Sequence, residues 1–306
     1  MKYEIQDNSQ DVVEKLGAPF SNLYILGADG IPPLFSKLIL RYPQKAINVG
    51  IAEADLVGVA AGLALDDNIV IVGTISCFLL RRAYEQIRLD VCEPNLPVKL
   101  FGYGGGLSYG LCGVTHHMID DITLLRTMPN MTIFIPSNTY ELNQCIKAAL
   151  EIRGPSYIRL GKQIKDISEV PIEDFLVGEP CVYKTGKDLL FLTMGGCFNN
   201  VLDATNELST LGIDAGVITI HTYNPVNQDK LRELIEPASK IMVVEEHNKF
   251  GGLGDLVREL CLPNKQFVFL GLKSDYYSYG EIEYMKEIAG IDKRNIVVSA
   301  LKLIET

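Results

Sequence analysis

The sequence lacks the features of several protein classes. It holds 28 lysines and arginines against 38 aspartates and glutamates, and a net charge of -10 argues against nonspecific binding to nucleic acid or anionic membrane. No apolar run reaches the length of a membrane span, and the N-terminus MKYEIQDNSQ has no signal-peptide shape. The 7 cysteines show no CxxC or CxxH spacing, which indicates reduced thiols in the cytoplasm. We therefore expect a cytoplasmic protein with no nucleic-acid or membrane partner.

The composition is that of a globular protein with room for two domains. Hydrophobic residues make up 47% of the 306 residues and charged residues 22%, which is enough apolar material for two real cores. The acidic balance does not exclude a small anionic substrate, because such a substrate needs only local positive charge.

Short apolar runs alternate with amphipathic stretches of helix length in the first half of the chain. Strand–helix alternation at this spacing is typical of a mostly parallel sheet that is covered on both faces. The predicted strands are 23–26, 46–49, 69–73, 97–102, 132–136 and 156–160, and the predicted helices are 31–42, 53–65, 79–93 and 139–152.

A second series of the same kind follows. Its predicted strands are 189–193, 216–220, 240–245 and 267–271, and its predicted helices are 199–211, 227–238 and 252–262. Residues 161–187 between the two series are polar and contain proline, without sustained periodicity. The sequence thus predicts an α/β protein of two doubly wound, mostly parallel-sheet domains, 1–165 and 186–306, joined by a linker at 166–185.

Glu53 is the most unusual charge in the first domain. It lies in NVGIAEADLVGVAAGLA (48–64), at the expected junction of loop and helix, among apolar and small residues. Buried carboxylates are costly unless they are paired or used. An acid that only favours a helix N-terminus is the ordinary alternative, and Asp55 in the same first turn fits that alternative better.

The stretch GVTHHMIDD (113–121) holds two of only four histidines, directly after the glycine-rich loop GYGGGLSYGLCG (102–113). Adjacent histidines cannot share one face of an element, so at most one should point into a given site. The spacing of His116, His117, Asp120 and Asp121 matches no strong metal motif, and we predict no metal bound by this chain. The loop lacks the GK[ST] or GxGxxG patterns of nucleotide sites, which leaves a flexible or tightly turning active-site loop. His247, in EEHNKFGGLGD (245–255), is expected to be structural or interfacial.

Taken together, these stretches resemble a known family. In the first domain, NVGIAEADLVGVAAGLA, FLLRRAYEQIRLDV, GVTHH, LLRTMPNMTIFIPSN and GPSYIRLGK are similar to the pyrimidine-binding domain of transketolase and 1-deoxyxylulose-5-phosphate synthase. In the second, LLFLTMGGCFNNVLDATNEL, ITIHTYNPVN and KIMVVEEHNKFGGLG resemble the C-terminal domain of the same families. The resemblance covers nearly the whole chain and keeps the order of the motifs.

The same resemblance implies a missing part. Full-length transketolases begin with a diphosphate-binding domain, whose GDG and following asparagine hold a divalent metal on thiamine diphosphate. Here GADG (27–30) lies in the wrong domain and is not followed by a suitably placed asparagine. The chain therefore looks like the C-terminal half of a split transketolase. The resemblance implies an N-terminal transketolase subunit as partner, Mg²⁺ or Ca²⁺ held mainly by that partner, and a self-dimer.

The resemblance also implies roles for site residues. Glu53 matches the glutamate that hydrogen-bonds the pyrimidine ring nitrogen and holds the cofactor in its imino tautomer. An aromatic residue near Phe78 stacks on the pyrimidine in split relatives, although a plain core phenylalanine is an alternative. Arg82, four residues further on, is expected beside the cofactor. His116 matches the G-x-T-H histidine that contacts substrate oxygens and assists proton movement.

Four further positions bear on the substrate. Arg159 and Lys162, in YIRLGK, both lie where relatives place a cation for a sugar phosphate, and the sequence does not rank them. His117 stands where many transketolases have glutamine and is kept as a substrate-binding candidate. Cys112 replaces an aspartate that reads a substrate hydroxyl, which puts the donor and acceptor sugars in doubt.

The expected function is transfer of a two-carbon ketol unit between sugar or sugar-phosphate substrates by a transferase subunit. One alternative is the beta subunit of a 2-oxo acid dehydrogenase, which shares the layout. The GVTHH and LLRTMPNM stretches favour transketolase over it. The other alternative is a non-catalytic binding protein of the same fold.

Overall fold

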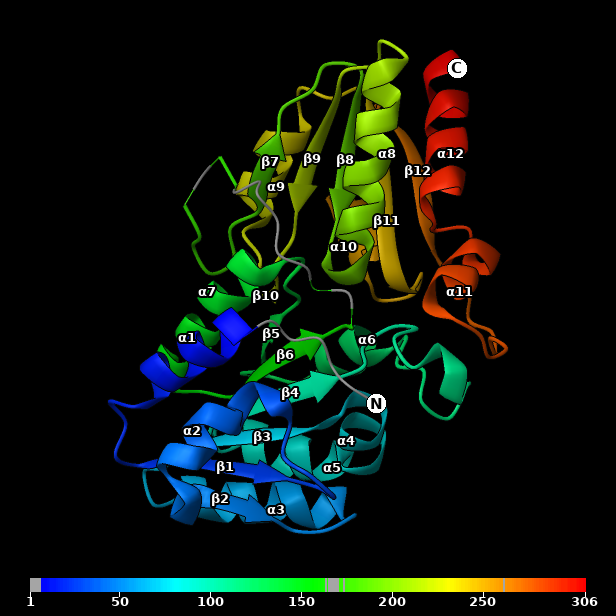
Figure 1. The fold of residues 1–306 in the computed structure, drawn as a ribbon. Coiled ribbons are helices and arrows are strands. Elements are labelled where there is room, and N and C mark those ends of the chain that lie inside the picture. Colours follow the sequence, from blue (N-terminus) through cyan, green and yellow to red (C-terminus); the bar gives the residue numbers. More distant parts are fainter. Residues whose placement is uncertain (1–6, 163, 165–170, 173, 261) are drawn as a thin grey trace.

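The computed structural model describes residues 7–162, 164, 171–172, 174–260 and 262–306. Two sheets form separate halves of the molecule, one above the other in Figure 1, each with helices packed on it. None of the helices in these ranges is long and apolar enough to cross a bilayer. The α/β class with two mostly parallel, doubly wound sheets, predicted from the strand–helix alternation, is confirmed.

The first sheet has seven strands in the order β10-β5-β6-β4-β3-β1-β2, and every pair except β10–β5 is parallel. Its strands are β1 (Leu23–Gly27), β2 (Ala46–Asn48), β3 (Ile69–Ile75), β4 (Val98–Tyr103), β5 (Thr132–Phe134), β6 (Ser156–Leu160) and β10 (Thr222–Asn224). The central strand β4 is buried along its whole length, because helices cover both faces of the sheet.

Two sets of helices cover the first sheet. Buried side chains of α3 and α4 pack on one face, and those of α1, α2 and α7 pack on the other. The helices are α1 (Asp7–Gly17), α2 (Ser36–Arg41), α3 (Glu53–Ala64), α4 (Ser76–Arg82), α5 (Tyr84–Gln86), α6 (Asp121–Leu125) and α7 (Thr139–Glu151). Short 3₁₀ turns lie at Pro33–Phe35, Pro43–Lys45 and Gly110–Cys112.

The second sheet has five strands in the order β12-β11-β8-β9-β7. Its strands are β7 (Cys181–Lys184), β8 (Leu189–Thr193), β9 (Ala215–Thr219), β11 (Lys240–Asn248) and β12 (Gln266–Leu272). The helices are α8 (Phe198–Thr210), α9 (Gln228–Ile235), α10 (Leu253–Glu259), α11 (Ile282–Ala289) and α12 (Lys293–Glu305), with a 3₁₀ turn at Gly195–Cys197. Side chains of α8, α11 and α12 pack in one core cluster, and those of α9 and α10 pack in the cluster shared with the first domain.

Two strands correct the predicted division of the chain. β7 (Cys181–Lys184) lies inside the stretch predicted as linker, yet it pairs antiparallel with β9 at the edge of the second sheet. β10 (Thr222–Asn224) belongs by sequence to the second domain but pairs with β5 of the first. Both are short, so their apolar alternation is too brief to separate them from loop by pattern. Residues 166–170 and 173 of the predicted linker lie outside the described residues.

The helix predicted at 79–93 is interrupted. α4 ends before Ala83, α5 is short, and Ile87–Cys92 form a π-helical stretch. Leu79, Ala83, Ile87 and Val91 are all fully buried and recur every fourth residue. In a regular α-helix a step of four residues overshoots one turn by about 40°, so such a stripe drifts away from the core. Wider turns keep these four side chains on one face.

Candidate active site

The site lies at the carboxyl edge of the first sheet. Glu53 follows β2, Phe78 follows β3, Tyr109 and His116 follow β4, and Lys162 follows β6. These strands run parallel, so their carboxyl ends meet at one edge. That edge is where open α/β sheets bind ligands.

Glu53 is the first residue of α3, and only 3% of its surface is exposed. Its Oε2 accepts a hydrogen bond from Nη1 of Arg82 at 3.2 Å. The Arg82 side chain is 58% exposed, so this ion pair is open to solvent on its basic side. The carboxylate is therefore held in an apolar junction with one partly exposed cation as partner, while Asp55 is exposed to solvent.

Phe78 and Arg82 form the wall next to Glu53. The Arg82 guanidinium carbon lies 5.4 Å from the centre of the Phe78 ring. Both side chains line an open pocket of about 450 Å³, together with Cys77, Arg81 and Thr115. Residues three and four apart on a helix share a face, which is why α4 presents Phe78, Arg81 and Arg82 together.

His116 follows Thr115, which lines this pocket, and contacts Phe78 of the helix. Its ring meets Phe78 edge-on, with ring centres 5.0 Å apart, and meets Tyr109 at 5.7 Å. The Thr115 hydroxyl lies 2.9 Å from His116 Nδ1 and can fix the orientation of the imidazole. The histidine is thus held by two rings and one hydroxyl next to the pocket wall formed by Phe78 and Thr115.

Lys162 completes the series. Its Nζ lies 4.9 Å from the centre of the Tyr109 ring, and its backbone N–H donates to the Ser108 hydroxyl at 3.2 Å. One unbroken chain of side-chain contacts therefore runs from Glu53 to Lys162. In order it is Glu53, Arg82, Phe78, His116, Tyr109 and Lys162.

Tyr109 is the member of this chain that the sequence reasoning missed. Burial raises the pKa of its phenol, so the hydroxyl stays neutral. Its place depends on Gly104, which has a φ of 80° and where a Cβ would overlap the Tyr109 ring. A tyrosine within a glycine-rich loop after a strand was the available signal. Of the two expectations for this loop, the tightly turning one describes the structure.

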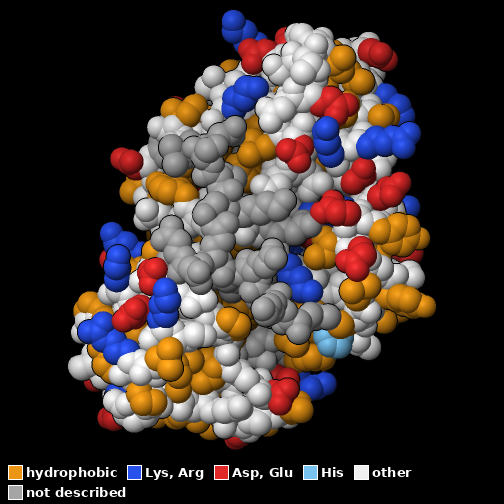
Figure 2. Space-filling view, viewed as in Figure 1, with side chains coloured by type: hydrophobic (Ala, Val, Ile, Leu, Met, Phe, Trp, Pro, Cys, Tyr) orange, Lys and Arg blue, Asp and Glu red, His pale blue; other side chains and the backbone are white. Residues whose placement is uncertain are grey.

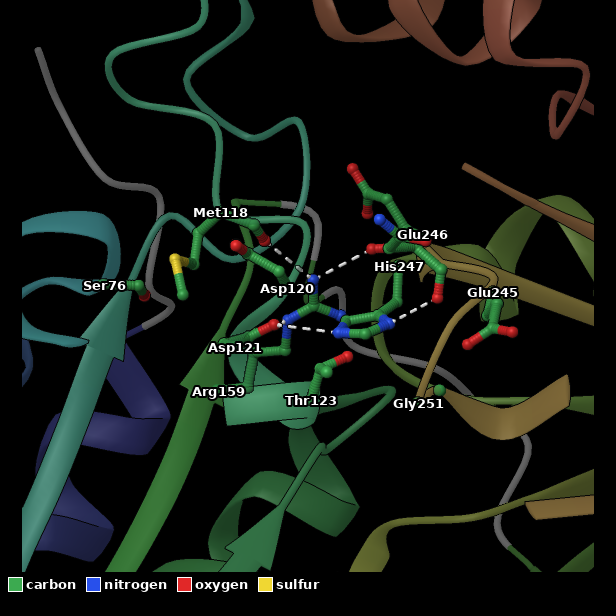
Figure 3. A network of polar contacts seen from close by, with 12 residues as sticks. Ser76, Met118, Asp120, Asp121, Thr123, Arg159, Glu245, Glu246, His247 and Gly251 are labelled. Carbon is green, nitrogen blue, oxygen red and sulfur yellow. Dashed lines mark hydrogen bonds and ion pairs between the residues drawn. The ribbon is translucent and has the colours of Figure 1, made fainter. Parts of the chain in front are cut away.

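Arg159 and His117 face away from the chain of contacts. Arg159 is 4% exposed, and its Nη2 donates to the backbone oxygens of Met118 at 3.2 Å and Glu246 at 2.9 Å. Its Nε lies 2.9 Å from Oδ2 of Asp121 (Figure 3). With Nη2 bound to two backbone oxygens and Nε paired with Asp121, Arg159 is placed to hold the fold, and Lys162 is the better candidate for a sugar phosphate.

A buried polar network surrounds Arg159 (Figure 3). Asp121 accepts from the Tyr157 hydroxyl at 2.8 Å and lies 3.8 Å from Nε2 of His247. Burial lowers the pKa of His247 to about 4, although Asp121 favours the proton. The imidazole is therefore neutral near pH 7, and Arg159 supplies the positive charge opposite Asp121. The network joins the two domains directly behind the loop that carries His116.

The glycine-rich loop is clamped by the second domain. The Glu246 carboxylate accepts from the Leu107 N–H at 2.8 Å. Gly106 has a φ of 68°, and a Cβ there would lie 2.6 Å from the Glu246 carboxyl carbon. Only glycine allows this approach. The second domain thus helps to position the loop, a role of Glu246 that the sequence alone did not suggest.

Among the described residues, no group of three or more His, Cys, Asp and Glu side chains could hold a metal ion. The GADG stretch lies at the end of β1, and its Asp29 adopts a φ of 63° in the turn that follows.

Comparison with known proteins decides the family. Residues 2–165 match the family described as the transketolase pyrimidine binding domain, and residues 179–279 match the transketolase C-terminal domain. The chain belongs to the transketolase family. It has the domains of a C-terminal subunit, and the transketolase interpretation is favoured over a 2-oxo acid dehydrogenase.

Relatives of similar length are subunits of split transketolases. An apulose-4-phosphate transketolase subunit of Actinobacillus succinogenes is 38% identical over 270 residues, 87% of this chain and 86% of that protein. The 6-deoxy-6-sulfo-D-fructose transketolase subunit SqwH of Clostridium sp. is 31% identical over 87% of this chain and 83% of its own. A solved structure described as a split gene transketolase, inactive beta4 tetramer, superposes with a TM-score of 0.86 at 30% identity, covering 97% of both chains.

The family's domains imply dependence on thiamine diphosphate. The residues at the site fit the aminopyrimidine part of that cofactor. A buried carboxyl group, a flat aromatic ring and an open pocket of about 450 Å³ lie side by side. Those are the features that a planar heterocycle with ring nitrogens requires.

Proposed function

We propose that this subunit holds the pyrimidine of thiamine diphosphate at Glu53, Phe78 and Arg82 and transfers a two-carbon ketol unit between sugar phosphates together with a separate diphosphate-binding subunit. The contact chain from Glu53 to Lys162 is the observation that carries the proposal. It puts an acid, an aromatic platform, a histidine and a cation in one continuous site.

Each residue then has a task that its surroundings support. When bound, thiamine diphosphate supplies the thiazolium carbon that carries the two-carbon unit. The Glu53 carboxyl group exchanges a hydrogen bond with the pyrimidine ring, in a junction from which water is largely excluded. Phe78 gives the ring a flat contact, and Arg82, whose side chain is 58% exposed, lies beside it. His116 moves a proton at the substrate oxygens.

Substrate choice is assigned to Lys162 and the 3₁₀ turn before His116. Lys162 is the cation on the far side of Tyr109 from the pocket and would meet the substrate's anionic end. The names of two relatives specify sugars with a phosphate or a sulfo group, which agrees with such a cation. Exposed Cys112 stands in the turn, where a thiol reads hydroxyls poorly. His117 does not contact the substrate in this proposal. It affects the substrate by positioning the loop segment that also carries His116.

The partner is proposed to be an N-terminal transketolase subunit that holds the diphosphate and its Mg²⁺ or Ca²⁺. The protein is also proposed to self-associate within that assembly and to act in the cytoplasm. Relatives named as subunits, and a beta4 tetramer described as inactive, support a chain that needs a second polypeptide.

Reconstitution tests the proposal. This chain is mixed with the candidate N-terminal subunit, thiamine diphosphate and Mg²⁺, and ketol transfer is followed with a panel of phosphorylated ketose donors. Activity is expected from the mixture and from neither chain alone. A mixture that binds the cofactor but transfers no ketol group from any donor would favour the non-catalytic alternative.

A further inference from the structure

A second pocket, of about 590 Å³, lies between the two domains on the other side of Arg81 from the cofactor pocket. It is lined by Arg81, Val114, His117, Ile119 and Asp120 of the first domain and by Asn248, Ser274, Asp275, Tyr276 and Tyr277 of the second. Its volume is in the range of small-molecule sites, and polar groups from both domains converge on it. Arg81 is the one residue that lines both pockets.

His117 is the buried polar group of this pocket. It is 3% exposed, and neither ring nitrogen makes a hydrogen bond within the part of the chain that the structure describes. Buried polar atoms normally have partners, and the Gly110 backbone lies close to this ring, so one of its two nitrogens is left for a bound molecule. Burial lowers the pKa of His117, although the backbone of Gly110 raises it. The ring is therefore neutral near pH 7 and offers one donor and one acceptor.

The charges on the wall select against an anion. Arg81 is already paired with Asp120 at 2.7 Å and also donates to the His117 carbonyl oxygen at 3.1 Å. Asp275 adds a further carboxylate from the second domain. The wall is thus neutral or slightly negative, in contrast to the cation-bearing substrate end at Lys162.

The aromatic and hydroxyl groups point to a particular ligand class. Tyr276 is 87% exposed at the loop that closes the pocket, and Tyr277 and Ser274 lie beside it. Figure 2 shows hydrophobic side chains, tyrosines included in that colour, along the flank formed by α11 and the loop before it. Aromatic rings next to carboxylate, amide and neutral imidazole groups suit a molecule with apolar C–H faces and many hydroxyls.

We infer that the pocket between the domains binds an uncharged polyhydroxylated molecule, a sugar or polyol, with His117, Asp120 and Asn248 on its hydroxyls and Tyr276 against a C–H face. The site is separate from the one proposed for ketol transfer. Of the adjacent histidines, His117 lines this pocket, whereas His116 contacts Phe78, because neighbouring side chains on the same segment point to opposite sides. The inference goes beyond the proposed function and does not depend on it.

Ribitol is the probe, and ribonate is its anionic counterpart of the same carbon number. Neither has a ketone or aldehyde carbonyl, so neither can take part in ketol transfer, and binding is read independently of activity. Saturation-transfer NMR titrations use the full chain, alone and with its partner subunit. We expect saturable binding of ribitol and at least tenfold weaker binding of ribonate. Asp275→Asn should reduce the preference for ribitol over ribonate, because it removes a carboxylate from the wall of the pocket.

Variants locate the binding. Tyr276→Ala should weaken ribitol binding at least fivefold, because it removes the stacking surface from an exposed loop without touching the core. Tyr284→Ala, another exposed tyrosine that does not line the pocket, is the matched control and should bind like the wild type. The inference is overturned by any of three results: no saturable ribitol binding in either form, equal binding by both tyrosine variants, or tighter binding of ribonate.

Discussion

Glu53 carries the most specific claim at the scale of single residues. Glu53→Gln keeps the size and one hydrogen-bonding oxygen but removes the exchangeable carboxyl proton. We expect ketol transfer by the assembled enzyme to fall roughly 100- to 10,000-fold, the usual range for loss of a positioned acid or base. Steady-state rates with saturating cofactor measure this.

Asp55→Asn is the control, because it changes an exposed acid in the same first turn of α3. Its rate should stay within about threefold of the wild type, since an exposed helix-start acid contributes little. Equal rates for Glu53→Gln and Asp55→Asn would remove Glu53 from the mechanism.

His221 makes a prediction about pH. Burial lowers its pKa to about 3, while the backbone of Glu179 raises it. The native imidazole stays neutral while the unfolded one titrates near 6.5, so its stabilising contribution is complete above pH 6.5 and is lost as pH falls toward 3. His221→Asn preserves a polar atom near the Thr222 hydroxyl, which lies 2.7 Å from His221 Nδ1.

The stability advantage of the wild type over His221→Asn should therefore shrink by about 2 kcal/mol between pH 7 and pH 5. Urea unfolding of both proteins at pH 8, 7, 6 and 5 gives this difference directly. The two upper points should differ little, and a gap that is constant down to pH 5 would show that His221 does not titrate as described.

At the scale of elements, the ion pairs at the domain boundary differ widely in burial. Asp121 on α6 faces Arg159 on β6, and neither side chain is more than 4% exposed. Asp121→Asn leaves the guanidinium buried without its counter-charge, which should lower the free energy of unfolding by about 3–5 kcal/mol. Chemical denaturation at pH 7 measures the loss.

Glu259→Gln is the comparison for that change. Glu259 on α10 pairs with Arg126 of the first domain at 2.7 Å, but its side chain is 48% exposed. Removing that charge should cost less than about 1 kcal/mol, because water screens the pair. Similar losses for the two variants would mean that the buried network is not the stronger link.

The elements also show what could be read from the sequence. Long periodic stretches such as 139–152 and 189–193 lie close to α7 and β8 as found, because their apolar period is clear over enough residues. Short β7 and β10 were not predicted, since pairing with a distant strand, rather than local pattern, makes them strands. The helix predicted at 79–93 is interrupted for another reason. Its buried residues recur every fourth position, and a regular α-helix does not keep such residues on one face.

For the site, the sequence supplied residue types and the resemblance supplied roles. Glu53, Phe78, Arg82, His116 and Lys162 came from motifs, and the structure places them in one chain of contacts. The sequence could not show that Arg159 turns toward the second domain, because that orientation depends on Glu246, 87 residues away. Tyr109 was hidden for the same reason, since its burial follows from the fold of the loop.

At the scale of the whole molecule, the proposed function divides the active site between two polypeptides. We propose that this chain supplies the acid, the aromatic wall, the histidine and the cation, and that another polypeptide holds the diphosphate and its metal. The second domain contributes by holding the glycine-rich loop through Glu246, at a distance of 2.8 Å from the Leu107 N–H. The second domain also contributes Asn248 and residues 274–277 to the pocket between the domains.

Exchange of the proton on the thiazolium carbon of thiamine diphosphate for deuterium tests the central claim most directly. Its rate is measured by NMR with Mg²⁺ present and this chain alone, the N-terminal subunit alone, both together, and both with Glu53→Gln. The account predicts fast exchange only when both subunits are present and Glu53 is intact. Fast exchange with either chain alone, or with the Glu53→Gln mixture, would contradict it.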